Sequence, residues 1–262
     1  TDIAYINLQK EQGRLTSGEA DYWKEKIGNL QEYQYGYHKG WSMILDTLTW
    51  PVLIMMLICI GIAPIFAGEY QSKCDSLILC MKYGRSKLIL AKIISGWLYA
   101  TGVYWGITLI YSSIYMIFLG TQGADLPIQL KYPAMSVGYN LTMGEAVGIT
   151  LLLGYFFTLG IMGITLFMSA LLKNTYAVII VAFLLIIIPT FLSLDTGGYV
   201  WSHVLSLLPP KIADFSFQSY TAYSIGNIVL SWPVMAILVN AIVAVLCSVL
   251  GYIIFRKHQV NK

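Results

Sequence analysis

The chain has 262 residues, of which 57% are hydrophobic and 11% are charged, and its mean hydropathy is +0.68. Soluble globular proteins carry charge on about a quarter of their residues, because charge must cover the surface. This composition excludes a soluble enzyme and indicates a polytopic membrane protein. The net charge of +3 is small and the basic residues form no dense patch, so we expect no nucleic-acid partner.

Five apolar runs are long enough to cross a hydrocarbon core, which takes about 20 helical residues. They are residues 41–66, 88–119, 143–172, 175–194 and 232–255. The runs are continuously apolar and do not alternate, and a helix satisfies every backbone hydrogen bond within such a run. The sequence therefore predicts an all-α fold, a polytopic transmembrane helical bundle with five spans in this chain.

The positions of lysine and arginine near the span ends predict the orientation, because these charges resist translocation. One face carries Lys73, Lys82, Arg85, Lys87, Lys92, Lys173, Arg256, Lys257 and Lys262, and the other carries Lys24, Lys26, Lys39, Lys131 and Lys211. The first group is the larger. We therefore expect a multi-pass protein of the cell membrane in which the C-terminus and the segment 67–87 are cytoplasmic.

Residues 1–40 are extracellular in this orientation, although they contain no apolar stretch that could carry them across the membrane. The chain also starts at Thr1 rather than at a methionine. We therefore expect a sixth, N-terminal span before the present sequence. Residues 1–40 then form an extracellular segment, and residues 41–262 form the transmembrane domain.

The second long external loop comprises residues 195–231 and includes an apolar stretch at 200–208. This stretch is too short to span the membrane and is closed by Pro209-Pro210. Two interpretations remain open: a re-entrant or interfacial helix at the outer membrane face, and a plain loop packed on the helix ends.

Sequence motifs for catalysis or metal binding are absent from the chain. It has no G-x-x-x-x-G-K-[ST] phosphate-binding loop and no H-E-x-x-H zinc motif. The scattered histidines are His38, His203 and His258, and the cysteines, which we interpret as free thiols, are Cys59, Cys74, Cys80 and Cys247. We therefore expect no catalytic residue, metal site or cofactor in this chain.

Three polar residues within the predicted spans are candidates for a role at a cavity or in packing: Asp46, Glu145 and Asn240. Asp46 and Glu145 are within a turn or two of the outer ends of their spans. They fit interfacial carboxylates that reach water, or groups at the mouth of a cavity. Asn240 lies deep in the last span, where we expect its amide to bond to a neighbouring helix.

Two pairs of glycines have the spacing that allows helices to approach closely in lipid. Gly102 and Gly106 are four residues apart, as are Gly144 and Gly148. This spacing predicts tight packing within the bundle or, alternatively, a dimer face.

The segment between the first two predicted spans carries the most detailed pattern. An acidic residue at the membrane exit is followed by a short helix with an apolar side, a glycine turn and a basic start to the next span. The residues of this pattern are Glu69, Leu77, Ile78, Met81, Gly84, Arg85, Ser86, Lys87 and Lys92. A solvated loop needs no apolar side, so the pattern predicts a surface that docks another protein or lies on lipid headgroups.

In order and approximate spacing, this pattern resembles the membrane subunit of type-2 ABC exporters. That family has a Glu at the start of a cytoplasmic segment, a leucine-rich short helix, and a small-residue turn followed by Arg and then Lys in the next helix. Here Lys73-Cys74 stands where the family often has Gly-Thr, and the usual proline before Arg85 is missing. The resemblance extends to the expected six spans and to the near-absent loop at Lys173-Asn174.

The resemblance implies that residues 41–262 form a permease domain and that the segment 67–87 couples it to a separate ABC ATPase subunit. ATP and magnesium belong to that ATPase, so this chain is not itself an enzyme. A second permease subunit, identical or related, completes a dimer in the lipid membrane. The aromatic-rich, weakly charged spans favour an amphipathic peptide or a hydrophobic drug as the exported substrate.

Two alternatives from other classes remain open. The first is a membrane-embedded sensor or immunity protein without transport, which would bind its partner through the tyrosine-rich residues 1–40. The second is an intramembrane enzyme, for which Asp46 and Glu145 are the available carboxylates.

Overall fold

The computed structural model describes residues 2–28, 35–47, 50–74, 77, 80–84, 86–132, 137–192, 198–225 and 228–257. Its helices are α1 (Asp2–Glu11), α2 (Ser17–Gly28), α3 (Lys39–Asp46), α4 (Trp50–Ile62), α5 (Pro64–Gln71), α7 (Lys87–Leu119), α8 (Met143–Leu171), α9 (Thr175–Phe191), α10 (Tyr199–Leu205) and α11 (Trp232–Lys257). Short 3₁₀ helices η1 (Ile128–Lys131) and η2 (Pro209–Asp214) and strands β1 (Ala222–Ile225) and β2 (Ile228–Ser231) complete the described elements. The chain is 75% helix and 4% strand, which confirms the predicted all-α polytopic bundle.

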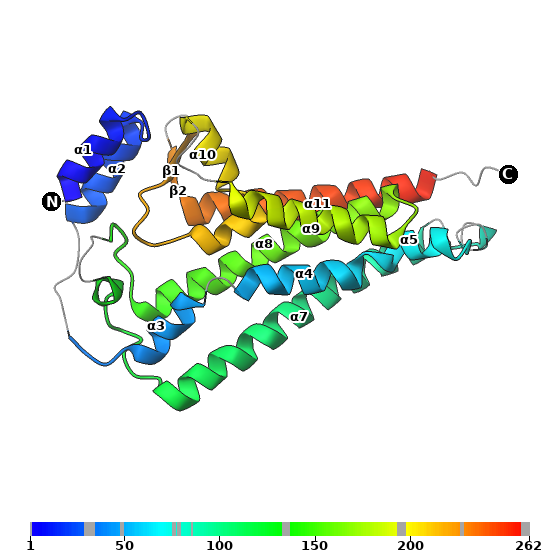
Figure 1. Ribbon diagram of the computed structural model, residues 1–262, viewed down its shortest axis with the longest axis horizontal. Coiled ribbons are helices and arrows are strands. Elements are labelled where there is room, and N and C mark those ends of the chain that lie inside the picture. Colours follow the sequence, from blue (N-terminus) through cyan, green and yellow to red (C-terminus); the bar gives the residue numbers. More distant parts are fainter. Residues whose placement is uncertain are drawn as a thin grey trace.

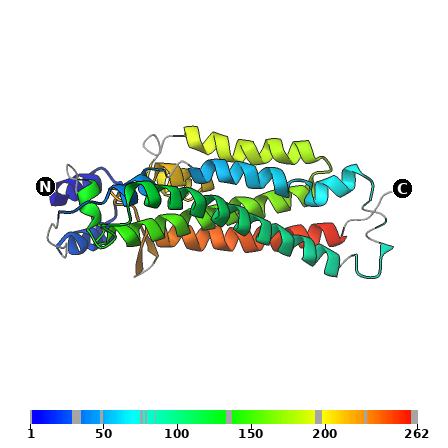
Figure 2. The ribbon, with the colours of Figure 1, turned by 90° about the horizontal axis from the view of Figure 1, so that it is seen from below.

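The long helices lie side by side along one axis, with α1, α2, α10 and the strands at one end and α5 at the other (Figures 1 and 2). Among the described residues, four helices are long and apolar enough to cross a membrane: Pro51–Gln71, Lys87–Leu119, Met143–Leu171 and Trp232–Lys257. The predicted span 175–194 corresponds to α9, which is apolar but has 17 residues and is shorter than these four. Hydropathy alone therefore located the long helices. The predicted and observed bounds differ most at the first span.

The predicted first span, residues 41–66, is wrong in its bounds. Residues 39–46 form the separate helix α3, which buries Ile44 and Leu45, and the long apolar helix runs from Pro51 to Gln71. Proline suits the first turn of a helix, because the missing N–H would have no partner there. The segment 67–87, predicted to be a cytoplasmic coupling segment, therefore begins inside a helix.

Helix α8 is the centre of the bundle. In its most apolar 18-residue stretch, 61% of the residues are buried, whereas the corresponding share for α7 is 11%. It packs closely on α11, where a β-carbon at Gly163 would lie 2.7 Å from the Cα of Ala244. The glycines that the sequence singled out do not make such contacts: a β-carbon at Gly102, Gly106 or Gly148 would meet nothing within 4 Å. The predicted packing role of these three glycines within the bundle is therefore wrong. Gly144 does lie close to another segment, because a β-carbon there would be 3.2 Å from the carbonyl oxygen of Ala124.

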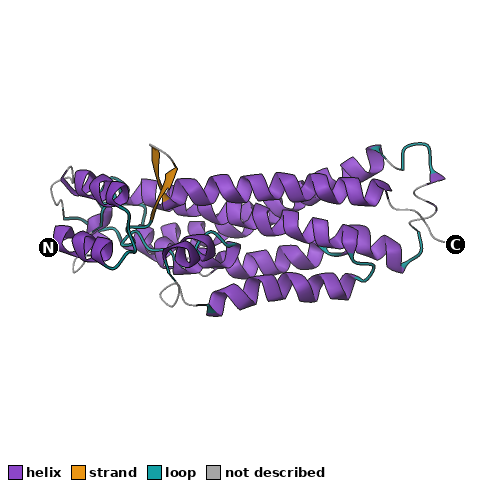
Figure 3. Ribbon diagram, turned by 90° about the horizontal axis from the view of Figure 1, so that it is seen from above, coloured by secondary structure: helices purple, strands orange, loops and turns teal. Residues whose placement is uncertain are grey.

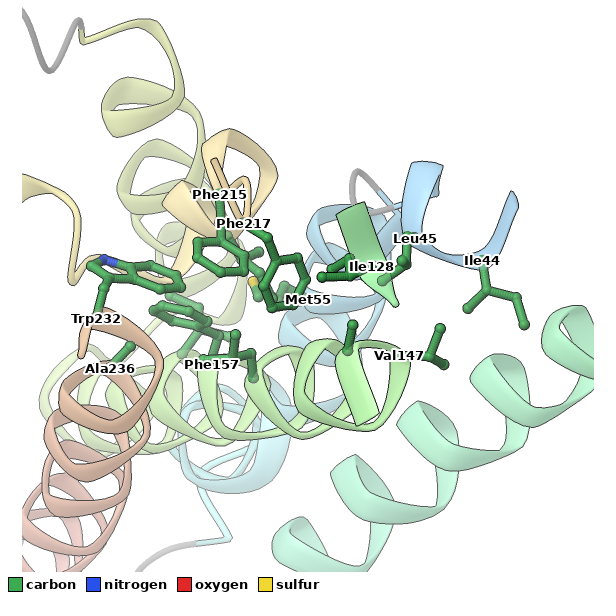
Figure 4. Packing of buried hydrophobic residues seen from close by; sticks show 14 of the residues in the cluster. Ile44, Leu45, Met55, Ile128, Val147, Phe157, Phe215, Phe217, Trp232 and Ala236 are labelled. Atoms are coloured by element: carbon green, nitrogen blue, oxygen red, sulfur yellow. The ribbon is translucent and has the colours of Figure 1, made fainter. Parts of the chain in front are cut away.

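An aromatic cluster joins α8, the start of α11 and the loop between η2 and β1. Trp232 stacks on Phe215 with ring centroids 4.4 Å apart and an interplanar angle of 11°, and Phe157 of α8 lies against the other face of the cluster, 5.9 Å from Trp232 (Figure 4). Phe217 contacts Phe215 at 4.9 Å. These rings fix the start of α11 on α8 and hold the loop between η2 and β1 against the bundle.

We call α1, α2, α10, β1, β2 and residues 219–221 the head. In Figure 3 the antiparallel hairpin of β1 and β2 lies beside the short helices of the head. Trp23 of α2 is 1% exposed and contacts the ring of Tyr220 at 5.3 Å. The segments 1–40 and 195–231, predicted as separate external regions, thus share one small core. The apolar stretch 200–208 is the seven-residue helix α10, packed on β1 through His203.

Candidate functional site

The kink between α4 and α5 is the first element of the candidate site. Pro64 lacks a backbone N–H, while Ala63 keeps helical angles (φ −50°, ψ −42°), so α5 continues α4 with an interrupted hydrogen-bond ladder. Ser169 of α8, which is fully buried, inserts its hydroxyl at this interruption. The Oγ atom accepts from the N–H groups of Phe66 and Ala67 at 3.0 Å each and donates to the carbonyl of Ala63 at 2.7 Å. A side chain of α8 thus caps the start of α5.

Glu69 of α5 and Lys92 of α7 form the second element, an ion pair between the two helices. The Nζ atom of Lys92 also donates to the carbonyl oxygen of Ile65 at 2.9 Å. The side chains are 14% exposed for Glu69 and 25% for Lys92. The second carboxylate oxygen of Glu69 is buried and has no hydrogen-bond partner among the described residues. The sequence predicted both residues as parts of one pattern, and the structure brings them together.

Further contacts join α5 to α8, α9 and α11. Tyr70 donates its hydroxyl to the carbonyl of Ala170 at 3.2 Å, and the ring of Phe66 lies 4.7 Å from that of Phe255. Gln71 donates to Asn174 at 3.1 Å, and Asn174 caps α9 by accepting from Tyr176. Helix α5 therefore has an ion pair with α7, hydrogen bonds to α8 and to the cap of α9, and an aromatic contact with α11. A displacement of α5 would change these contacts.

The segment that follows α5 is the third element. Its described apolar side chains are exposed: Leu77 at 71%, Met81 at 51% and Tyr83 at 51%. The ammonium of Lys87 lies 4.7 Å from the centre of the Tyr83 ring, and Lys82 approaches the same ring at 5.5 Å. Gly84 is buried and Ser86 precedes α7 without a side-chain cap. Ile78 and Arg85, predicted with these residues, lie outside the described residues.

The predicted polar groups at the opposite end have structural partners. Asp46 is 57% exposed and forms an ion pair with Lys131, whose side chain is 8% exposed. Lys131 also donates to the carbonyl of Ser42 at 2.9 Å, and the pair borders an open cavity of about 510 Å³. Asp46 thus lies at a cavity, as one of the two sequence-based interpretations expects; its position at a membrane interface stays a prediction.

Glu145 and Asn240 have roles in the fold. Glu145 forms a capping box with Thr142: its carboxylate accepts from the N–H of Thr142 at 2.9 Å, and its own N–H donates to the threonine hydroxyl at 3.2 Å. Asn240 is 2% exposed and donates to the carbonyl groups of Leu207, at 3.2 Å, and Ala236, at 3.0 Å. The expected bond to a neighbouring helix is thus made to the segment after α10 instead.

The head contains a buried polar network that the sequence analysis did not identify. Glu19 of α2 is fully buried and accepts from the hydroxyl of Tyr199 at 2.7 Å and from the N–H of Thr16 at 2.8 Å. Tyr199 stacks on His203 at a ring distance of 4.0 Å. The pKa of Tyr199 is raised to about 12, mainly by burial and to a lesser extent by the hydrogen bond to Glu19. Burial likewise raises the pKa of Tyr223 to about 12.

A family model described as "Protein of unknown function (DUF2705)" matches residues 22–260 of the 262-residue chain. The chain belongs to the DUF2705 family. The match includes the kink at Pro64, the Glu69–Lys92 pair and α10, while α1 and Glu19 precede it. The chain matches no curated protein and no solved structure. Within the described residues, no three His, Cys, Asp or Glu side chains lie together as a metal site would require.

Of the residues that sequence reasoning missed, some had a local signal. Thr16 and Glu19 have the spacing of a capping box, and Gly226-Asn227 between β-formers is a hairpin signal. Ser169 had none, because a serine inside an apolar run gives no indication of which backbone it will contact.

Proposed function

We propose that this DUF2705 protein is the membrane subunit of an ATP-driven exporter of the ABC type. The observation that carries the proposal is the position of α5, which contacts α7, α8, the cap of α9 and α11 and precedes the exposed side chains of Leu77 and Met81 in the chain. A docking surface attached to such a helix can transmit the movement of a partner to the whole bundle. The resemblance of the pattern from Glu69 to Lys92 to that family supports the same function.

In this mechanism the segment 67–87 docks on a separate cytoplasmic ATPase, which holds ATP and magnesium. ATPase movement displaces α5 about the kink at Pro64, where Ser169 replaces bonds of the helix ladder. The Glu69–Lys92 pair carries the displacement to α7, and the contact of Phe66 with Phe255 carries it to α11. A second permease subunit, identical or related, completes the path for an amphipathic peptide or a hydrophobic drug.

Exposed apolar side chains at Leu77 and Met81 are the part of this mechanism that can be tested most directly. Protein interfaces gain much of their affinity from a few apolar anchors, and truncating one costs about 1–3 kcal/mol. The variant L77A/M81A should lose co-purification of an ATPase from native membranes, together with transport. The control is Leu98→Ala in α7, because Leu98 is similarly exposed, at 68%, but lies on a long apolar helix. Unchanged co-purification and transport in L77A/M81A would contradict the docking role.

A membrane-embedded sensor or immunity protein is the second candidate. It is favoured by the head, which encloses a polar cavity of about 370 Å³ remote from α5. Full resistance or signalling by L77A/M81A without any co-purified ATPase would support this candidate over the exporter. The intramembrane enzyme has less support, because Asp46 is paired with Lys131 and Glu145 caps α8.

A further inference from the structure

The cavity of the head lies between chain segments that are far apart in the sequence. Its volume is about 370 Å³, within the range of small-molecule sites, roughly 300–1,000 Å³. Tyr5, Gln9 and Gln12 line it from α1 and the residue that follows this helix. Ser202 lines it from α10, and Thr221 lines it from the loop before β1. Both walls lie at the end of the bundle opposite α5 (Figure 1), so this cavity is separate from the site at the kink.

The basic side chains of the lining are already engaged. Arg14 lines the cavity but has an interaction within the protein. Both ring nitrogens of His203 lie against carbonyl oxygens, that of Tyr199 at 2.8 Å and that of Ala222 at 3.0 Å. No aspartate, glutamate or lysine is among the lining residues in the described part of the chain. Since a charge that leaves water without a partner is costly, this lining favours a ligand without net charge.

Neutral polar groups of the lining still have capacity for hydrogen bonds. Within the described residues, the amides of Gln9 and Gln12 and the hydroxyl of Thr221 have no side-chain hydrogen bond, although Gln9 is half-buried. The hydroxyl of Ser202 donates to the carbonyl of Tyr199 at 3.0 Å, and its oxygen can still accept. Amides and hydroxyls both donate and accept hydrogen bonds, as the hydroxyl groups of a ligand do. The two walls therefore suit a ligand that carries several hydroxyl groups.

Tyr5 adds an aromatic surface to the same wall. It is 49% exposed, and its ring lies 5.9 Å from that of Tyr220. Tyr5, Gln9 and Gln12 follow one another at intervals of four and three residues, so they share one face of α1 and its last turn. An aromatic ring can pack against the C–H groups of a sugar ring while amides beside it bond to the sugar hydroxyls.

We propose that the head cavity binds a small neutral saccharide, which bonds to Gln9 and Gln12 and packs against Tyr5. A saccharide combines the three properties that the lining favours: no net charge, many hydroxyl groups and a C–H face for an aromatic ring. An acidic sugar should bind less tightly, because its carboxylate would leave water for a wall whose basic groups are engaged. The site does not depend on an exporter function, since it lies at the opposite end of the bundle from α5.

The test uses the full chain in phosphatidylcholine nanodiscs, because common mild detergents carry sugar headgroups. Saturation-transfer NMR titrations measure the dissociation constants of the probes. Maltose and methyl glucoside are the neutral sugars, methyl glucuronide is the matched acidic sugar, and N-acetyl-trialanine amide is a neutral peptide. We expect both neutral sugars to bind, and methyl glucuronide to bind about threefold to tenfold more weakly than methyl glucoside. Failure of both neutral sugars to bind, or tighter binding of the peptide than of either sugar, would overturn the proposal.

Variants of α1 place the sugar in this cavity. Q9A/Q12A removes two amides of the lining and should weaken maltose binding about tenfold or more. Asn7→Ala is the matched control, because Asn7 is an exposed amide of the same helix that does not line the cavity, and it should leave binding unchanged. Gln12 is exposed, so Gln12→Ala alone should keep the near-ultraviolet circular dichroism of the head and still weaken binding about threefold. Unchanged maltose binding in Q9A/Q12A and Gln12→Ala, or an equal loss in Asn7→Ala, would contradict the assigned site.

Discussion

Lys92 of α7 bonds to α5 at two points one turn apart, the carboxylate of Glu69 and the carbonyl oxygen of Ile65. The lysine therefore holds both the side chain that pairs with it and the backbone beside the kink at Pro64. Helix α7 is the least buried of the four long apolar helices. The contact of Lys92 with α5 is therefore a main point through which a movement of α5 would reach α7.

The Glu69–Lys92 pair should be energetically coupled. Lys92→Met leaves a carboxylate that is 14% exposed without its partner, and we expect it to lower the free energy of unfolding by about 1–3 kcal/mol. In E69Q/K92M, no charge remains unpaired, so part of this loss should be recovered. Denaturant unfolding in micelles, followed by tryptophan fluorescence, measures the cycle. Single-variant losses that simply add in the double variant would show that the pair is not coupled.

Ser169 should stabilise the kink. Ser169→Ala removes an acceptor from the N–H groups of Phe66 and Ala67 and a donor to Ala63, and we expect a loss of about 1–3 kcal/mol in the same unfolding assay. Ser95→Ala is the matched control, because Ser95 is exposed and bonds to the carbonyl of Lys92 in its own helix. Equal stability of the two variants would indicate that the helix restores its own ladder without Ser169.

Gly163 should be required for the packing of α8 on α11. A β-carbon there would lie 2.7 Å from the Cα and 2.8 Å from the carbonyl oxygen of Ala244, and backbone atoms cannot move aside as a side chain can. Gly163→Ala should therefore cost about 1–3 kcal/mol. Gly148→Ala in the same helix meets nothing within 4 Å and should be neutral or slightly stabilising. If both changes had the same effect, the close approach of the two helices would be in doubt.

The head should lose its tertiary structure at alkaline pH. The pKa values of Tyr199 and Tyr223 are raised from 10.0 to about 12, chiefly by burial, so the folded state holds these protons more tightly than the unfolded chain. Their stabilisation is complete below about pH 10 and is lost as the pH rises through about 12. Near-ultraviolet circular dichroism and tyrosinate absorbance should change together in this range. Tyr35→Phe is the control at an exposed tyrosine, 88% accessible, and should not alter the transition.

The proposed orientation can be tested with the native thiols. All four cysteines are free, as predicted, and Cys74 and Cys80, near α5, are exposed. If this end is cytoplasmic, a membrane-impermeant maleimide should not label the wild-type chain in intact cells but should label it after permeabilisation. Ser17→Cys in the head should become labelled in intact cells. Labelling of the wild-type chain in intact cells would invert the orientation.

The sequence alone determined the class of the protein and the location of its long helices. Runs such as 88–119 and 232–255 can be read directly, because hydropathy is a property of neighbouring residues and a membrane-length helix satisfies its own backbone bonds. The order of acidic, apolar, glycine and basic residues between the first two predicted spans placed Glu69 and Lys92 in one pattern, 23 residues apart.

Only the tertiary structure decided how these helices are joined. The contact of Ser169 with Phe66 spans 103 residues, and that of Tyr199 with Glu19 spans 180; neither partner carries a local signal of the other. The packing glycine Gly163 could not be separated from Gly148 by spacing, since the face of α8 that meets α11 depends on the whole bundle. Local composition fixes where a helix forms, whereas the partner of each polar or small side chain is set by which surfaces come together when the chain folds.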